Sequence, residues 1–149
     1  MSSLPPSVSS VVLLDTDVWS LAIFPRRTFS VQGERWRRVL LGRDVVVAAQ
    51  TEAELRFGAL TAGWKAERLA ALEVGLATTP TLPVTADVIR TVAEVRAACR
   101  RVGHPLGAKH HMGDAWIAAT AIAYRVPLLS GDGVFNNAPG LWLLAENTD

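Results

Sequence analysis

The stretch Val11-Val12-Leu13-Leu14-Asp15-Thr16-Asp17 decides the fold that the sequence predicts. Four consecutive apolar residues indicate a buried strand, and the acidic turn behind them leads into a second apolar run, residues 18–24. Pro25 closes that run, as expected where a helix stops. The stretch therefore predicts a strand that ends in carboxylates and continues into a helix.

Strand-like and helix-like segments continue to alternate along the chain. The clearest helix carries Val88, Val92, Val95 and Cys99 at the i, i+4, i+7, i+11 spacing of a buried stripe. Further strands are predicted at residues 45–49, 82–84, 126–129 and 141–144, and helices at residues 51–60, 64–76 and 115–123 and around Trp36. Strands that alternate with helices run parallel and are joined by right-handed crossovers. The predicted fold class is α/β, a three-layer α/β/α sandwich around a central parallel sheet of about five strands.

Length and composition bound the class of protein. The 149 residues suit one domain, taken here as residues 11–149, behind a loose leader of serine and proline at residues 1–10. Half of the residues are hydrophobic and the formal net charge is +1, so nucleic-acid binding has to rest on local patches. One cysteine supports neither an internal disulfide nor a zinc cluster, and no run of about twenty apolar residues predicts a membrane helix. We expect a cytoplasmic protein.

Four carboxylates lie far apart in the sequence, each where a predicted strand ends or a predicted helix begins: Asp15, Glu54, Asp114 and Asp132. In a parallel sheet, such positions gather along one edge. Several acids that crowd together repel one another unless a divalent cation neutralises them, and oxygen-only ligation is what Mg²⁺ or Mn²⁺ prefers. The pattern therefore predicts a metal site.

Each acid also has an ordinary structural explanation. Glu54 stands three residues after Thr51, which is the spacing of a capping box, and Asp17 stands where a helix N-cap is expected. Asp114 precedes an alanine-rich helix whose macrodipole favours a negative charge, and Asp132 lies in a glycine-rich turn. These alternatives do not explain why all of the acids fall at the same predicted edge.

Two groups of basic residues are weaker candidates for binding a metal, phosphate or RNA. The three histidines occupy a predicted loop, residues 103–113, where metal or phosphate binding competes with the simpler interpretation of a solvated loop: His104, His110 and His111. The arginines around Trp36 form either an RNA-facing patch or an ordinary exposed helix face: Arg26, Arg27, Arg35, Arg37 and Arg38. The second interpretation is the simpler one there too.

Four motifs taken together resemble PIN-domain ribonucleases of the VapC toxin type. In order, they are LLDTDVWS at residues 13–20, TEAELRFG at 51–58, DAWIAATA at 114–121 and SGDGVF at 130–135. The resemblance implies that the catalytic and metal-binding residues are Asp15, Glu54, Asp114 and Asp132. It implies contacts of Thr16, Asp17, Ser20 and Ser130 with the ligands or substrate. Two positions depart from the family pattern: Asp17 is frequently a neutral polar residue, and Ser130 stands where threonine is common.

The resemblance also implies an activity and its partners. Members of this family are typically Mg²⁺- or Mn²⁺-dependent endoribonucleases that act as toxins of type II toxin–antitoxin systems. The implied partners are an RNA substrate, a cognate antitoxin and a second copy of the chain, in a homodimer and a toxin–antitoxin hetero-oligomer.

Other classes of protein remain open at this point. A haloacid-dehalogenase-like phosphatase would use Asp15 and Asp17 as its Asp-x-Asp pair, but it needs an acid soon after Asp132, and residues 133–140 contain none. A receiver-like module would use the acids near Asp15 together with Lys109, but it would carry a glutamate in place of its phosphoacceptor aspartate. A PIN-like scaffold without activity is the third alternative, because a fold does not establish a chemistry.

Overall fold

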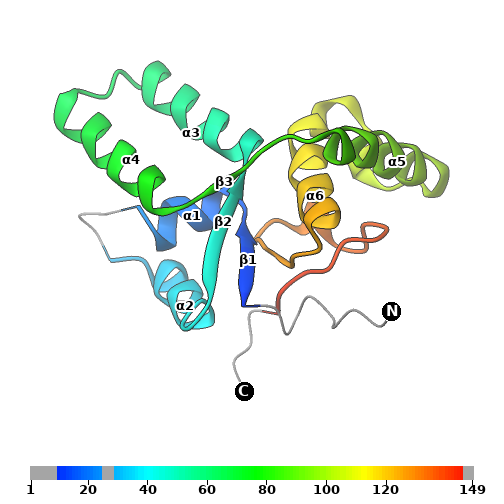
Figure 1. The fold of residues 1–149 in the computed structure, drawn as a ribbon, viewed down its shortest axis with the longest axis horizontal. Helices are drawn as coiled ribbons and strands as arrows, with labels where there is room; N and C mark the ends of the chain where they lie inside the picture. The colour runs from blue at the N-terminus through cyan, green and yellow to red at the C-terminus, as the bar shows by residue number, and fades with distance from the viewer. Residues whose placement is uncertain (1–9, 25–28, 146–149) are drawn as a thin grey trace.

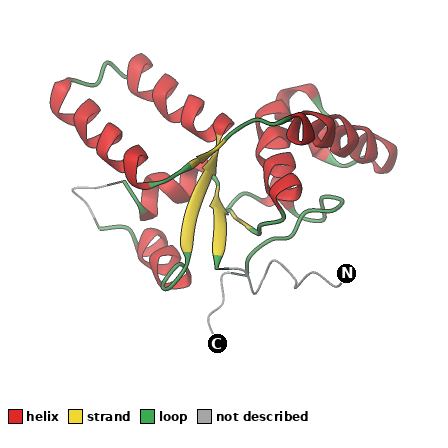
Figure 2. Ribbon diagram, in the orientation of Figure 1, coloured by secondary structure: helices red, strands yellow, loops and turns green. Residues whose placement is uncertain are grey.

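The computed structural model describes residues 10–24 and 29–145, which form a parallel sheet between two layers of helices (Figures 1 and 2). The strands are β1 (Val11–Leu14), β2 (Asp44–Ala48), β3 (Thr81–Leu82) and β4 (Leu128–Leu129), in the order β3-β2-β1-β4. The helices are α1 (Thr16–Ala22), α2 (Val31–Val39), α3 (Ala49–Thr61), α4 (Ala66–Thr78), α5 (Ala86–Val102) and α6 (Met112–Tyr124), with short 3₁₀ helices η2 (Pro105–Gly107), η3 (Lys109–His111) and η4 (Gly133–Phe135). The predicted α/β sandwich is confirmed.

Strand β1 lies in the middle of the sheet. Leu14 pairs with Val47 of β2 on one side, and Leu13 pairs with Leu128 of β4 on the other. Val12, Leu13 and Leu14 are fully buried. Since successive side chains of a strand point to opposite faces, Val12 and Leu14 enter one core and Leu13 enters the other. Three of the four apolar residues of β1 are thus buried, on both faces of the sheet, as in central strands of parallel sheets, and Val11 is partly buried.

The two cores belong to different helices, with α1 to α4 on one side of the sheet and α5 and α6 on the other (Figure 1). On the first side, Trp19 is buried, its Nε1–H donates to Thr79 Oγ1 at 3.0 Å, and Gly75 packs so closely on the ring that a Cβ would lie 2.9 Å from Cζ2. On the second side, α5 buries the stripe that the sequence predicts: Val88, Val92, Val95 and Cys99.

The predicted fifth strand is wrong, since the described sheet has four strands. Residues 141–144 form only an isolated parallel bridge, in which the Leu128 N–H donates to Trp142 O and the Leu144 N–H donates to Leu128 O. Because β4 is two residues long, it offers this segment a single bridge.

Several element boundaries also differ from the prediction. Strand β2 ends at Ala48, one residue early, because Ala49 already begins α3. Strand β3 stops before Pro83, which has no N–H to continue the ladder. The predicted loop 103–113 contains η2 and η3, and α6 begins within it at Met112.

The predictions made for residues 1–9, Pro25, Arg26 and Arg27 lie outside the described residues. Across the parts of the chain that are described, no helix is both long and apolar enough to cross a bilayer.

Candidate functional site

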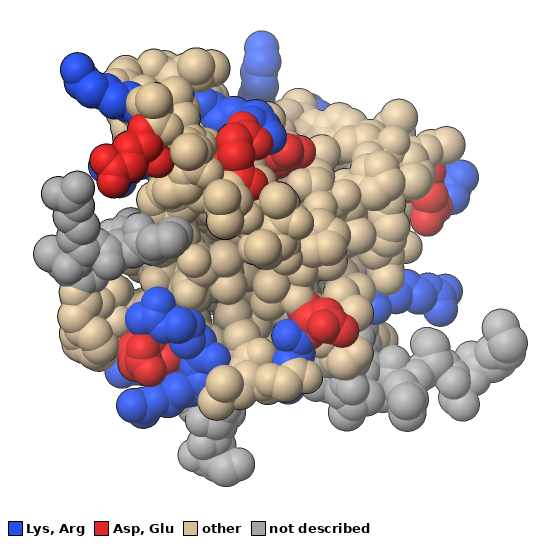
Figure 3. Space-filling view, turned by 60° about the vertical axis from the view of Figure 1, so that its left-hand side comes forward, with Lys and Arg blue, Asp and Glu red and all other residues tan. Residues whose placement is uncertain are grey.

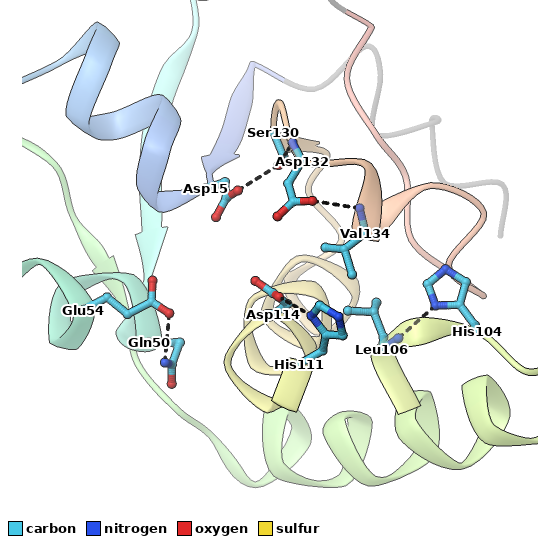
Figure 4. A network of polar contacts seen from close by, with 10 residues as sticks. All are labelled: Asp15, Gln50, Glu54, His104, Leu106, His111, Asp114, Ser130, Asp132 and Val134. Atoms are coloured by element: carbon cyan, nitrogen blue, oxygen red, sulfur yellow. Dashed lines mark hydrogen bonds and ion pairs between the residues drawn. The ribbon is translucent and has the colours of Figure 1, made fainter. Parts of the chain in front are cut away.

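The four acids predicted from the sequence come from four different segments and border one region at the carboxyl ends of β1 and β4 (Figure 4). Asp15 directly follows β1, Asp132 lies three residues after β4, Glu54 is on α3, and Asp114 is in the first turn of α6. Within residues 10–24 and 29–145, no three Asp, Glu, His or Cys side chains converge tightly enough to hold an ion as they stand. The structure therefore gathers the acids without closing them on a single point.

Asp15 is the buried member of this group, with 7% of its surface exposed. Its Oδ1 accepts a hydrogen bond from Thr16 N at 2.8 Å and so caps α1, and its Oδ2 accepts one from Ser130 Oγ at 2.8 Å. Burial raises the pKa of Asp15 from 3.8 to about 6 against these two hydrogen bonds, and the charges of Asp17 and Asp114 raise it further. A buried carboxylate among neutral donors and other carboxylates is a position that gains from a bound cation.

Glu54 contacts α1 as well as the first turn of its own helix. Its Oε2 accepts from Thr16 Oγ1 at 2.5 Å, and its Oε1 accepts from Gln50 Nε2 at 3.1 Å. The capping-box interpretation is wrong. The N-cap of α3 is Ala48, the helix begins at Ala49, and Thr51 is a buried residue within its first turn. The carboxylate of Glu54 is thus free of a capping role and is held beside the residue that follows Asp15.

Ser130 connects two of the acids. Its Oγ–H donates to Asp15 Oδ2, while the same oxygen accepts from Asp132 N at 3.0 Å. Asp132 Oδ1 accepts from Val134 N at 2.9 Å and so caps η4. Gly131 lies over the buried Trp36, where a Cβ would sit 2.9 Å from Cζ2, and this close approach requires a glycine. The serine that replaces the family's common threonine therefore retains the hydroxyl contact.

The start of α6, which carries Asp114, packs on α3 beside Glu54. A Cβ on Gly113 would lie 3.0 Å from Gln50 Nε2 and 3.2 Å from Glu54 Oε1, so the glycine allows the start of α6 to pack on α3. Asp114 Oδ2 lies 3.1 Å from His111 Nδ1 (Figure 4). The side chains of Asp114 and His111 are 28% and 29% exposed.

The histidine loop is more ordered than the sequence suggests, and a solvated loop is the wrong interpretation for two of its three histidines. His104 Nδ1 accepts from Leu106 N at 3.1 Å, which leaves Nε2 to donate to Asn136 O at 2.8 Å. His104 therefore joins two loops and has no role as a ligand in this arrangement. His111 contacts Asp114, and the i, i+3 spacing of the two residues was a signal in the sequence that pointed to this pair.

The remaining predicted residues divide between the site and the surface. Asp17 is exposed in the first turn of α1, and the N-cap interpretation is wrong for it because Asp15 fills that position. Ser20 lies one turn beyond Thr16 on α1, and its role stays a prediction. Figure 3 shows basic side chains gathered over α2, whose exposed arginines are Arg35, Arg37 and Arg38. One of them, Arg37, pairs with Glu34 at 3.0 Å.

Comparison with known proteins places this geometry in a family. The PIN domain model matches residues 12–141. Over 106 residues the chain is 34% identical to Ribonuclease VapC5 of Mycobacterium tuberculosis (strain ATCC 25618 / H37Rv), a match that covers 69% of this chain and 75% of that protein.

Solved structures show the same fold. VapBC2 from Rickettsia felis, bound to a DNA fragment from its promoter, matches with a TM-score of 0.72 and 20% identity, over 89% of this chain and 96% of that one. VapBC-5 from Mycobacterium tuberculosis, a member of the VapBC family of toxin-antitoxin systems, matches with a TM-score of 0.63 and 26% identity, over 91% and 98%. These matches favour the ribonuclease resemblance over the phosphatase and receiver alternatives. The chain belongs to the PIN-domain family, in its VapC branch.

Proposed function

We propose that this protein is a divalent-metal-dependent endoribonuclease and the toxin of a toxin–antitoxin pair. The observation that carries the proposal is Asp15, a buried carboxylate whose pKa is raised to about 6 and which borders three further acids. Perturbed carboxylates of this kind are typical of functional sites. Membership of the VapC branch supplies the reaction class.

The donor set fits Mg²⁺ or Mn²⁺, because every candidate ligand is a carboxylate oxygen. Asp15 and Asp114 are the proposed direct ligands, and Glu54 and Asp132 would act through water or hold a second ion. Such an ion would supply an activated water nucleophile and neutralise charge on the phosphodiester. Thr16 and Ser130 hold the carboxylates of Glu54 and Asp15 in place through their hydroxyl groups.

The proposed partners follow from the same site. The RNA backbone would reach the acids along α1, where Ser20 is a proposed substrate contact. Several similar solved structures carry toxin–antitoxin or VapBC in their names, which supports a cognate antitoxin as partner. A guanidinium from that antitoxin would pair well with the acidic group. A cytoplasmic homodimer that assembles with the antitoxin is the proposed state of the protein.

The proposal is tested by expressing the chain alone in a bacterial host. We expect growth arrest together with new RNA 5′ ends, mapped by sequencing before and after induction. Co-expression of a small protein encoded next to the gene should relieve the arrest. An Asp114→Asn chain at the same expression level serves as control. Normal growth with no new 5′ ends, at verified expression of the parent chain, would contradict the toxin function.

Glu54→Gln is expected to lower the cleavage rate at least about tenfold, because the side chain keeps its size and its contact with Thr16 but loses its charge. The metal-free variant should be as stable as the parent or more stable, since one of several like charges is removed. Thermal stabilisation by Mn²⁺ should shrink. Cleavage of a fluorogenic RNA and melting temperature with and without Mn²⁺ provide both measurements.

Glu52→Gln is the matched control for this experiment. Glu52 is on the same helix, but it pairs with the exposed Arg56 at 3.1 Å. Its variant should cleave RNA at the parental rate. Parental cleavage and undiminished Mn²⁺ stabilisation in Glu54→Gln would remove Glu54 from the site and leave three aspartates.

A further inference from the structure

His111 stands at the entrance to α6 with its ring turned toward Asp114 (Figure 4). Its Nδ1 lies 3.1 Å from Asp114 Oδ2. An ionised carboxylate can only accept a hydrogen bond, so Nδ1 must carry the hydrogen in this contact. The bond therefore fixes both the ring tautomer of His111 and one of the two oxygens of Asp114.

The backbone beneath His111 is anchored, so that the ring is a fixed donor. The His111 N–H donates to Ala108 O at 3.1 Å within η3. Just before this turn, Arg100 Nε donates to Gly107 O at 3.0 Å and ties the loop to α5. The ring of His110 packs against the ring of His111, with 4.2 Å between centroids. A donor held in this way restricts the rotation of Asp114.

We propose that His111 is a positioning residue for Asp114. It holds Oδ2 and so presents Oδ1 to a divalent cation between the four acids. The inference rests on the proposed function and deepens it, because it assigns to the histidine loop a part in metal binding. Residues that hydrogen-bond to metal ligands in this manner typically change metal affinity by about 10- to 100-fold when they are removed.

Two substitutions of His111 separate positioning from a merely structural role. His111→Asn places an amide N–H close to where Nδ1 stands, whereas His111→Gln places one close to Nε2 and leaves Asp114 Oδ2 without its donor. We expect His111→Gln to raise the Mn²⁺ concentration for half-maximal thermal stabilisation about tenfold, and His111→Asn to stay within about threefold of the parent. The kcat for a fluorogenic RNA at limiting Mn²⁺ should fall in His111→Gln, with KM for RNA unchanged.

Lys109→Gln is the matched control, because Lys109 is exposed in η3, the same 3₁₀ helix as His111. Its Mn²⁺ midpoint and kcat should be parental. The melting temperatures of all three variants without metal report whether each one folds. Parental Mn²⁺ affinity in His111→Gln overturns the inference, as does an equal loss in His111→Asn and His111→Gln. If the parent chain shows neither Mn²⁺ stabilisation nor cleavage, the proposed function itself fails.

Discussion

Asp15→Asn is expected to abolish RNA cleavage, by at least about a hundredfold, and at the same time to stabilise the metal-free protein at neutral pH. Cleavage is lost because a neutral amide replaces the carboxylate that we propose as a direct metal ligand. The fold is retained because asparagine still offers an oxygen to Thr16 N and so still caps α1.

The gain in stability has a defined pH dependence. The folded protein holds the Asp15 proton with a pKa of about 6, against an ordinary value of 3.8, so it binds that proton more tightly than the unfolded chain. The contribution of Asp15 to the free energy of unfolding therefore falls as pH rises from about 4 to about 6, and it stays low above that range. A change of one in pKa corresponds to about 1.4 kcal/mol, so removing the charge gains at most about 3 kcal/mol at neutral pH and close to nothing near pH 4.

Urea unfolding of the parent and of Asp15→Asn at about pH 4.5 and about pH 7.5, without metal, measures this difference. Asp44→Asn is the control. Asp44 is exposed at the first residue of β2, at the end of the strand away from the acids, and this substitution removes the same charge from the chain. Retained cleavage, or an Asp15→Asn protein less stable than the parent at the higher pH, would contradict the role proposed for Asp15.

Removal of divalent metal is the second change with a large expected effect. Cleavage should vanish in EDTA and return with Mg²⁺ or Mn²⁺, because the four carboxylates alone provide no means of neutralising a phosphodiester. Ca²⁺ should stabilise the protein against heat yet support little turnover, since its larger and looser coordination positions the attacking water less well.

A fluorogenic RNA and a series of metal concentrations after dialysis against EDTA suffice for this measurement. An Asp114→Asn preparation, purified in parallel, excludes a contaminating ribonuclease that needs no metal. Full cleavage by parent protein that has been shown to be free of metal would contradict the proposed mechanism.

The sequence predicted the fold where the pattern was local and strong. The apolar run before Asp15 is continuous and the stripe on α5 follows the period of a helix. Residues 12–14 of the run and all four residues of the stripe are buried as expected. The strand at residues 141–144 was predicted from apolar content alone. Whether such a segment pairs over several residues depends on the length of its neighbour, and β4 is too short for that.

The candidate site shows the same division between local and long-range information. The positions of the acids followed from predicted strand ends and helix starts, and the structure gathers the four around one region, although their role as metal ligands stays a prediction. The capping box failed because residues 51–54 match it locally while α3 starts two residues earlier. The contacts of Thr16 with Glu54 and of Ser130 with Asp15 join residues 38 and 115 positions apart, and no local pattern encodes them.

The hydrogen bond from Ser130 to Asp15 can form only after most of the chain has been synthesised. During translation, β1 and α1 leave the ribosome long before β4 and the loop that carries Ser130, 115 positions later. Until then the central strand lacks one neighbour, and Asp15 lacks the hydroxyl group that holds it. A chain whose synthesis stops before residue 130 lacks both Ser130 and Asp132, so it has neither the hydroxyl group that holds Asp15 nor the fourth acid of the proposed site.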